Sequence, residues 1–169
     1  WGSGPADTKK VAVVLSGCGV YDGAEICEAS STLIHLSAAG CAVSVFAPDK
    51  DQAHVVDHTK GEDGGPPRNV MVEAARISRG SISPLDTLQP DAFDVLIVPG
   101  GFGAAKNLCN HAMVAQGDPA KFEVDESLAS AIKGFNAAGK PIGLCCIAPV
   151  IAASLLKCKV TVGQAEGAM

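Results

Sequence analysis

Apolar and polar residues alternate in blocks along the chain, and the apolar blocks have the lengths of buried strands. Three runs rich in β-branched residues each end in a turn-forming sequence, and a shorter fourth run follows Lys140-Pro141: Val11 to Leu15, Ala42 to Ala47, Phe93 to Val98, and Ile142 to Cys145. Short continuous apolar runs of this kind are typical of strands that are buried on both faces of a sheet. The pattern therefore predicts four such strands.

Two segments between these runs have the period of amphipathic helices. The first, Glu25 to Ala39, ends before Gly40, and the second, Val124 to Ala138, ends before Gly139. Each carries one apolar stripe, made of Ile26, Ala29, Leu33 and Leu36 in the first and of Leu128, Ala131, Ile132 and Phe135 in the second. Alternating strands and helices predict parallel strands joined by right-handed crossovers. We therefore expect an α/β fold, a doubly wound and mostly parallel sheet with helices on both faces.

The remaining segments bear on the domain organisation. Asp51 to Arg68 is polar and rich in glycine and proline, so it should lie on the surface, and Asn107 to Lys121 is also irregular. No linker divides the chain, which predicts one domain over residues 1–169. A last strand is expected at Lys159 to Val162, and only seven residues follow it. Since such a fold usually closes with more strands and a helix, we expect a truncated or gapped C-terminal part.

Composition and charge exclude several classes of function. The 169 residues carry a net charge of −5 with dispersed basic residues, whereas a nucleic-acid surface needs a clustered basic stripe. No apolar run reaches the roughly 18 residues that cross a bilayer, and Trp1 to Pro5 resembles a processed end more than a signal peptide. Seven cysteines without a C-x-x-C pair argue against a disulfide framework and a zinc site. We expect reduced thiols, no metal and no cofactor.

The run GLCCIAP at residues 143–149 is the most informative for chemistry. An apolar strand leads into Cys146 and small residues, and Pro149 suits the first turn of a helix. The Cys146 sulfur would then lie near the N–H groups of a helix start, which favours the thiolate and lowers the pKa of the thiol. This arrangement is the thiol counterpart of a nucleophile elbow. A structural, buried Cys146 is the alternative, and Cys145 is expected to face the opposite way, into the core.

Two further features could complete a site around this thiol. The glycines of PGGFGA at residues 99–104 allow backbone N–H groups to approach a ligand, and together with the N–H of Ile147 they could form an oxyanion hole. Glu28, one turn after Glu25 on the first predicted helix, could be protonated, hydrogen-bond the sulfur and move a proton. An ordinary glycine turn and a solvated pair of acids are the alternatives for these two features.

Three blocks of the sequence resemble the ThiJ/PfpI superfamily: KPIGLCCIAP at 140–149, PGGFGAAKNL at 99–108 and SGCGVYDGAE at 16–25. The segments RNV at 68–70 and EAARISRG at 73–80 add to the match, which covers about Lys10 to Gly163. Within the superfamily, the chain is most similar to the glutamine amidotransferase-like ES proteins of vertebrate mitochondria and to the bacterial enhancing-lycopene-biosynthesis proteins. The resemblance implies a flavodoxin-like fold, a mitochondrial location and a homodimer or higher oligomer.

The resemblance also implies site residues: Cys146 as nucleophile, Glu28 as its partner acid, and Gly101 and Ile147 as oxyanion donors. We further predict that Gly100 and Cys18 bind substrate. The spacing back from Gly40 selects Glu28 over Glu25. One departure concerns a histidine that many members keep beside the cysteine. All four histidines here precede Cys146, and Gln164 lies near the place of the missing one.

Four functions are compared on this basis. The leading one is a glyoxalase-like or deglycase-like enzyme, in which the Cys146 thiolate attacks a small aldehyde and Glu28 moves a proton. The alternative is a redox sensor or metabolite-binding protein with the same thiol, in which Cys18 could be a resolving thiol. Glutamine hydrolysis is disfavoured because it needs a histidine after the cysteine. A dinucleotide site is disfavoured because Gly23 comes one residue late for G-x-G-x-x-G.

Overall fold

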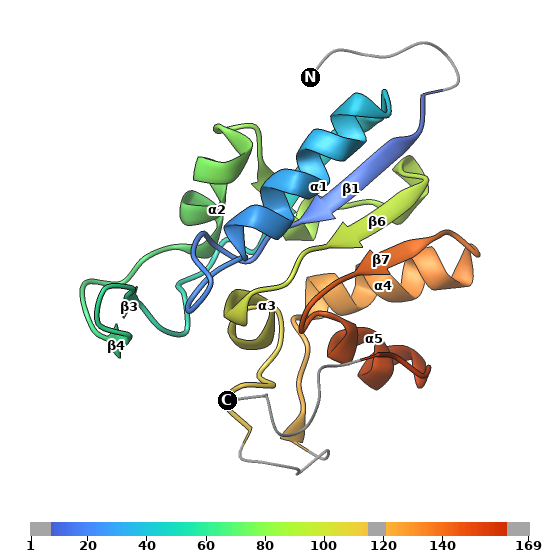
Figure 1. Cartoon of the computed structure of the whole chain (residues 1–169). Coiled ribbons are helices and arrows are strands. Elements are labelled where there is room, and N and C mark those ends of the chain that lie inside the picture. Colours follow the sequence, from blue (N-terminus) through green and yellow to red (C-terminus); the bar gives the residue numbers. More distant parts are fainter. Residues whose placement is uncertain (1–7, 115–120, 162–169) are drawn as a thin grey trace.

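The fold is organised around a five-stranded sheet in which every neighbouring pair is parallel (Figure 1). The computed structural model describes residues 8–114 and 121–161, so Trp1 to Pro5, Val162 and Gln164 lie outside the described residues. The strands are β1 (Lys10–Val14), β2 (Ala42–Ala47), β5 (Ser83–Pro84), β6 (Val95–Val98) and β7 (Ile142–Leu144), in the order β5-β2-β1-β6-β7. A separate antiparallel hairpin, β3 (Val56–Asp57) with β4 (Glu62–Asp63), extends from the polar segment.

Helices cover both faces of this sheet, as Figure 1 shows. One face packs against α1 (Ile26–Ala38) and α2 (Val70–Ser78), and the other against α4 (Glu126–Ala137) and α5 (Pro149–Leu156). The smaller elements are α3 (Phe102–Lys106), η1 (Leu85–Thr87) and η2 (Pro90–Ala92). The predicted α/β, doubly wound and mostly parallel sheet is thereby confirmed.

Strand β1 shows why the buried strands appear in the sequence as unbroken apolar runs. Successive side chains of a strand point to opposite faces. Val11 and Val13 join the core under α1 and α2, whereas Ala12 and Val14 join the core under α4 and α5. All four side chains are at most 1% exposed. A strand at the centre of such a sheet has no solvent face, so from Val11 to Val14 polar residues are absent from both faces, and the exposed Lys10 stands only at the start of the strand.

The order of the strands determines where loops converge. Apart from the two-residue edge strand β5, the sheet has the flavodoxin-like order, in which the chain runs outwards from β1 to β2 and later returns to the other side of β1 with β6. A crevice forms at this switch point, outside the carboxyl ends of β1 and β6. The loop after β1, the loop after β6 and the turn after β7 all lie at this edge of the sheet.

Most predicted boundaries agree with the structure. The bounds of β2 are as predicted, and those of β1, β6, β7, α1 and α4 lie within two residues of the prediction. Lys159, Val160 and Thr161, the described part of the last predicted strand, form no strand. Within the described residues, no helix combines the length and the apolar character that a bilayer span requires.

Candidate functional site

Cys146 occupies a tight turn between β7 and α5 and has a left-handed backbone, with φ 56°. The Ala148 N–H donates to the Cys145 carbonyl at 3.0 Å, which closes the turn and puts Cys146 at its second position. Among the described residues, only two other non-glycine residues have positive φ, and both are helix C-caps, where this conformation is common. Cys146 has no capping role. An exposed cysteine in a strained strand-to-helix turn has the geometry of a nucleophile elbow.

Gly100, at the end of β6, is where the Cys146 turn and α1 come together. A Cβ built on Gly100 would collide with the Cβ of Cys146 and would lie 2.9 Å from Glu28 Oε2 and 3.0 Å from the Cys145 carbonyl oxygen. Only a residue without a side chain allows three segments to approach this closely. The predicted substrate-binding residue Gly100 therefore touches both predicted catalytic residues.

Hydrogen bonds fix Glu28 against the same loop. Its backbone N–H donates to the Glu25 side chain at 2.7 Å, which caps α1. The Glu25 N–H donates to the Gly100 carbonyl at 2.9 Å, and the Gly100 N–H donates to Glu28 Oε2 at 2.9 Å. These bonds join the start of α1 to the end of β6 and hold the Glu28 carboxylate at the switch point.

The thiol that contacts Glu28 is that of Cys145, whose Sγ donates to Glu28 Oε2 at 3.5 Å. The expectation that Glu28 hydrogen-bonds the Cys146 sulfur is wrong. In the described part of the chain, no hydrogen bond joins Glu28 to Cys146, and Glu28 Oε2 accepts the Gly100 N–H and the Cys145 thiol instead. The expectation that Cys145 lies in the core is wrong, because the residue is exposed. Strand β7 ends at Leu144, so Cys145 already belongs to the turn and does not follow the alternation of the strand. The adjacent pair of cysteines was the one signal in the sequence for a second thiol.

The surroundings of the Cys145 sulfur keep it protonated. Although the residue as a whole is exposed, partial shielding of the sulfur from water raises the pKa of the Cys145 thiol. The Gly100 N–H lowers this pKa, and the charge of Glu28 and its hydrogen bond raise it. The balance is a raised pKa, so at neutral pH Cys145 is a thiol that donates to a carboxylate.

Gly101 and Ile147, the predicted oxyanion donors, directly follow Gly100 and Cys146 in the chain. Gly101 has φ 91°, and a Cβ there would collide with backbone atoms of Gly23 and Glu25. Within residues 8–114 and 121–161, neither the Gly101 N–H nor the Ile147 N–H donates a hydrogen bond. Both donors are thus available to a ligand, as the role predicted for them requires.

Cys18, the predicted second substrate-binding residue, lies in the loop after β1 and is half-buried. Burial raises the pKa of its thiol, the Arg76 charge lowers it, and Glu73 and Asp22 raise it. Two of these three charges come from α2. The charged groups that shift the pKa of the Cys18 thiol therefore lie mainly on α2, whereas the Cys145 thiol contacts Glu28.

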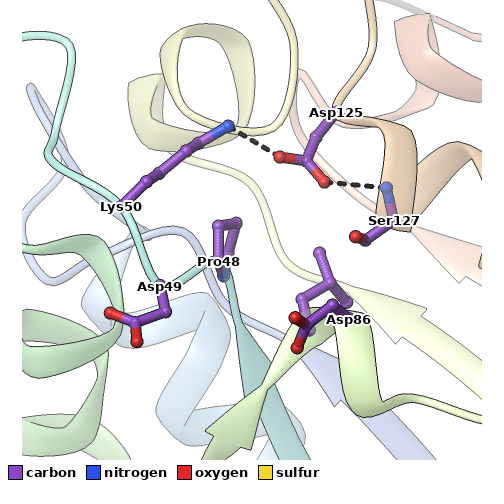
Figure 2. Close-up of a pocket in the computed structure, with 7 residues that line it drawn as sticks. Pro48, Asp49, Lys50, Asp86, Asp125 and Ser127 are labelled. Atoms are coloured by element: carbon purple, nitrogen blue, oxygen red, sulfur yellow. Dashed lines mark hydrogen bonds and ion pairs between the residues drawn. The ribbon is translucent and has the colours of Figure 1, made fainter.

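A pocket elsewhere on the molecule has a different lining. It lies beyond the carboxyl ends of β2 and β5 and is lined by Pro48, Asp49, Lys50, Leu85, Asp86, Asp125 and Ser127 (Figure 2). The Lys50 Nζ and Asp125 Oδ2 form an ion pair across it at 2.7 Å. None of the predicted site residues lines this pocket. Across the described residues, no group of three or more histidine, cysteine or acidic residues could hold a metal ion.

Comparisons with known proteins identify relatives of this chain. No protein-family model matches the chain. The human glutamine amidotransferase-like class 1 domain-containing protein 3, mitochondrial, is 53% identical over 167 residues, which is 96% of this chain and 61% of the human protein. The rat ES1 protein homolog, mitochondrial, is 53% identical over 98% of this chain and 62% of its own length. The chain thus spans less than two thirds of these relatives.

A solved structure gives the same assignment. An isoprenoid biosynthesis protein with an amidotransferase-like domain from Ehrlichia chaffeensis has a TM-score of 0.81 and 40% identity, over 88% of this chain and 68% of that one. The fold and these relatives together define an amidotransferase-like α/β protein. The chain belongs to the amidotransferase-like family of these relatives, which confirms the resemblance to the ES proteins found in the sequence.

Proposed function

We propose that this protein is a cysteine-dependent enzyme for small reactive carbonyls, of the glyoxalase or deglycase kind, with Cys146 as the nucleophile. The observation that supports the proposal most is the exposed Cys146 in a left-handed turn, directly against Gly100 and beside the Glu28 carboxylate. A nucleophile held in this way is presented to a ligand rather than packed in the core. Family membership supports the same class of site.

The proposed reaction converts glyoxal to glycolate without an external oxidant. The Cys146 thiolate adds to one aldehyde carbon and forms a hemithioacetal, whose oxyanion accepts hydrogen bonds from the Gly101 and Ile147 N–H groups. Glu28 removes the proton from this carbon and returns it to the neighbouring carbon, so the first carbon is oxidised and the second reduced. Water then cleaves the thioester, which releases the hydroxy acid and restores the thiol.

Removal of the nucleophile tests the proposal. Cys146→Ala should reduce consumption of glyoxal and formation of glycolate, followed by proton NMR, to the level without protein. Cys27→Ala is the matched control, because Cys27 is also exposed but lies on the helix α1. It should keep the wild-type rate, and circular dichroism should show that both variants are folded. Turnover that persists in Cys146→Ala would exclude this mechanism.

Two properties of the relatives extend the proposal. The human, rat and zebrafish relatives are mitochondrial proteins by name, and we carry that location over to this chain. We also carry over the homodimer that the family resemblance implies. Light scattering of the purified protein tests the second point, and a monomer at all concentrations would contradict it.

A further inference from the structure

Two adjacent cysteines share the turn at the end of β7, and the proposed function uses only one of them. Cys145 and Cys146 are both exposed. Cys145 donates its thiol hydrogen to Glu28 Oε2 at 3.5 Å, and the same oxygen accepts the Gly100 N–H at 2.9 Å. A protonated thiol beside a nucleophilic cysteine, with a carboxylate already in contact with its hydrogen, has no role in the carbonyl reaction.

We propose that Cys145 is the resolving thiol of Cys146, and that hydroperoxides convert this pair to a reversible disulfide within the turn. The proposal rests on the reactivity of Cys146 in the proposed function. It assigns the resolving role to Cys145 rather than to Cys18, the alternative from the sequence. Cys145 is the direct neighbour of Cys146 and is bound to the acid that the site provides.

The chemistry needs only a hydroperoxide as oxidant. The Cys146 thiolate attacks the terminal peroxide oxygen, so the O–O bond breaks, an S–O bond forms and the alcohol or water leaves. Glu28 then takes the proton of Cys145, and the resulting thiolate attacks the Cys146 sulfur. The S–O bond breaks as the S–S bond forms, and the departing hydroxide receives the proton from Glu28 and leaves as water.

Glu28 is required in the second step because of the state of Cys145. The raised pKa of this thiol keeps it protonated at neutral pH, and a protonated thiol does not attack a sulfenic acid. The hydrogen bond to Oε2 already points the proton at its acceptor. The same acid would therefore serve the carbonyl reaction in the reduced protein and disulfide formation in the oxidised one.

The short span between the two cysteines makes the disulfide easy to reverse. Consecutive Cα atoms are about 3.8 Å apart across a trans peptide, which is below the usual Cα separation of about 4.4–6.8 Å in disulfides. Strained disulfides are reduced readily by thiols. Formation must also reshape a turn that holds Cys146 at φ 56° and places the Ile147 N–H, so the oxidised protein should lose carbonyl turnover until it is reduced.

Mass spectrometry after limited peroxide treatment tests the proposal on the whole chain. The tryptic peptide 134–157 contains Cys145 and Cys146 as its only cysteines. In the wild type it should lose two hydrogens and regain them after treatment with a thiol reductant. In Cys145→Ser, dimedone should label the Cys146 sulfenic acid several-fold more than in the wild type. Cys18→Ser and Cys27→Ser should both form the same intrapeptide disulfide as the wild type.

The outcomes separate this proposal from the proposed function. A Cys18–Cys146 disulfide, or equal dimedone labelling of the wild type and Cys145→Ser, would overturn the resolving role while Cys146 remains reactive. If iodoacetamide and peroxide both leave Cys146 unmodified in the wild type and in Cys145→Ser, the nucleophile itself is absent and both proposals fail. Glu28→Gln provides a further readout, because it should slow disulfide formation while the sulfenic acid still forms.

Discussion

At the scale of single residues, Gly100 determines whether the Cys146 turn and the Glu28 carboxylate can meet. Gly100→Ala would push a methyl group into Cys146 Cβ, so the turn must move away from α1. Misplacement of reacting groups by about 1 Å can lower a reaction rate by two orders of magnitude. We therefore expect the rate at which iodoacetamide alkylates Cys146 to change at least about tenfold and glyoxal turnover to be lost. The overpacked site should also destabilise the fold by about 1–3 kcal/mol.

Gly143→Ala provides the matched control for that substitution. Gly143 lies on β7, close to the same turn, but a Cβ there would meet its nearest neighbour, Ile97 Cγ1, at the ordinary distance of 3.7 Å. Its alkylation rate and glyoxal turnover should stay within about twofold of the wild type. If Gly100→Ala behaves like Gly143→Ala, the close approach at Gly100 does not organise the site.

The sequence predicted the position of Cys146 but not the partner of Glu28. An apolar strand that runs into a cysteine, small residues and Pro149 predicts a strand-to-helix turn, and the left-handed Cys146 agrees with it. The contact between Glu28 and Cys145 depends on where β7 ends and on how α1 is tied to Gly100. Residues 117 positions apart come together only through the sheet, so no local pattern encodes their distance.

At the scale of elements, Asp125 connects the loop after β2 to the start of α4. Its side chain accepts hydrogen bonds from Ser127 N at 3.1 Å and Leu128 N at 3.3 Å, and it pairs with Lys50 (Figure 2). Asp125→Ala should lower the free energy of unfolding by about 1–2 kcal/mol, because it removes both the helix cap and the ion pair. Urea denaturation measures this loss.

Asp125→Asn distinguishes the two contributions. Asparagine can still cap the helix, so this variant loses only the ion pair, which is worth at most about 1 kcal/mol between partly exposed groups. Lys50→Ala should match Asp125→Asn. Equal losses in Asp125→Asn and Asp125→Ala would show that the charge, and not the cap, stabilises the start of α4.

The elements that the sequence analysis missed are short or depend on tertiary contacts. Strand β5 has two residues, which is too few for a periodic pattern, and it pairs only with the end of β2. Helix α2 has nine residues and begins at an Asn69 cap, directly after the polar segment. It buries Glu73, which pairs with Arg76 at 3.0 Å, so a charged residue stands where the apolar stripe would be expected. Longer elements with an apolar face on every turn were predicted within two residues.

At the scale of the whole molecule, burial on both faces of one sheet accounts for the fold and for the position of the site. The apolar residues divide into two cores, one under α1 and α2 and one under α4 and α5. With both faces covered, the carboxyl-end edge of the sheet is where loops from several strands meet. The fold class followed from the sequence because continuous apolar runs require this layering. The strand order required the structure, since sequence periodicity does not specify which strands are neighbours.

Because Cys109 is buried in one of these cores, the free energy of unfolding of the whole molecule should fall at alkaline pH. Burial raises the pKa of this thiol from its ordinary value of 9.0 to about 11, although the His111 N–H acts to lower it. Above pH 9 the unfolded chain loses the proton while the folded chain keeps it, so stability is full below pH 9 and falls towards pH 11. From about pH 8 to about pH 10.5, the wild type should lose about 2 kcal/mol more than Cys109→Ala in anaerobic urea denaturation. Cys27→Ala, which removes an exposed thiol, is the control and should show the wild-type dependence of the free energy of unfolding on pH. If the wild type and Cys109→Ala show the same dependence, Cys109 ionises in the folded protein.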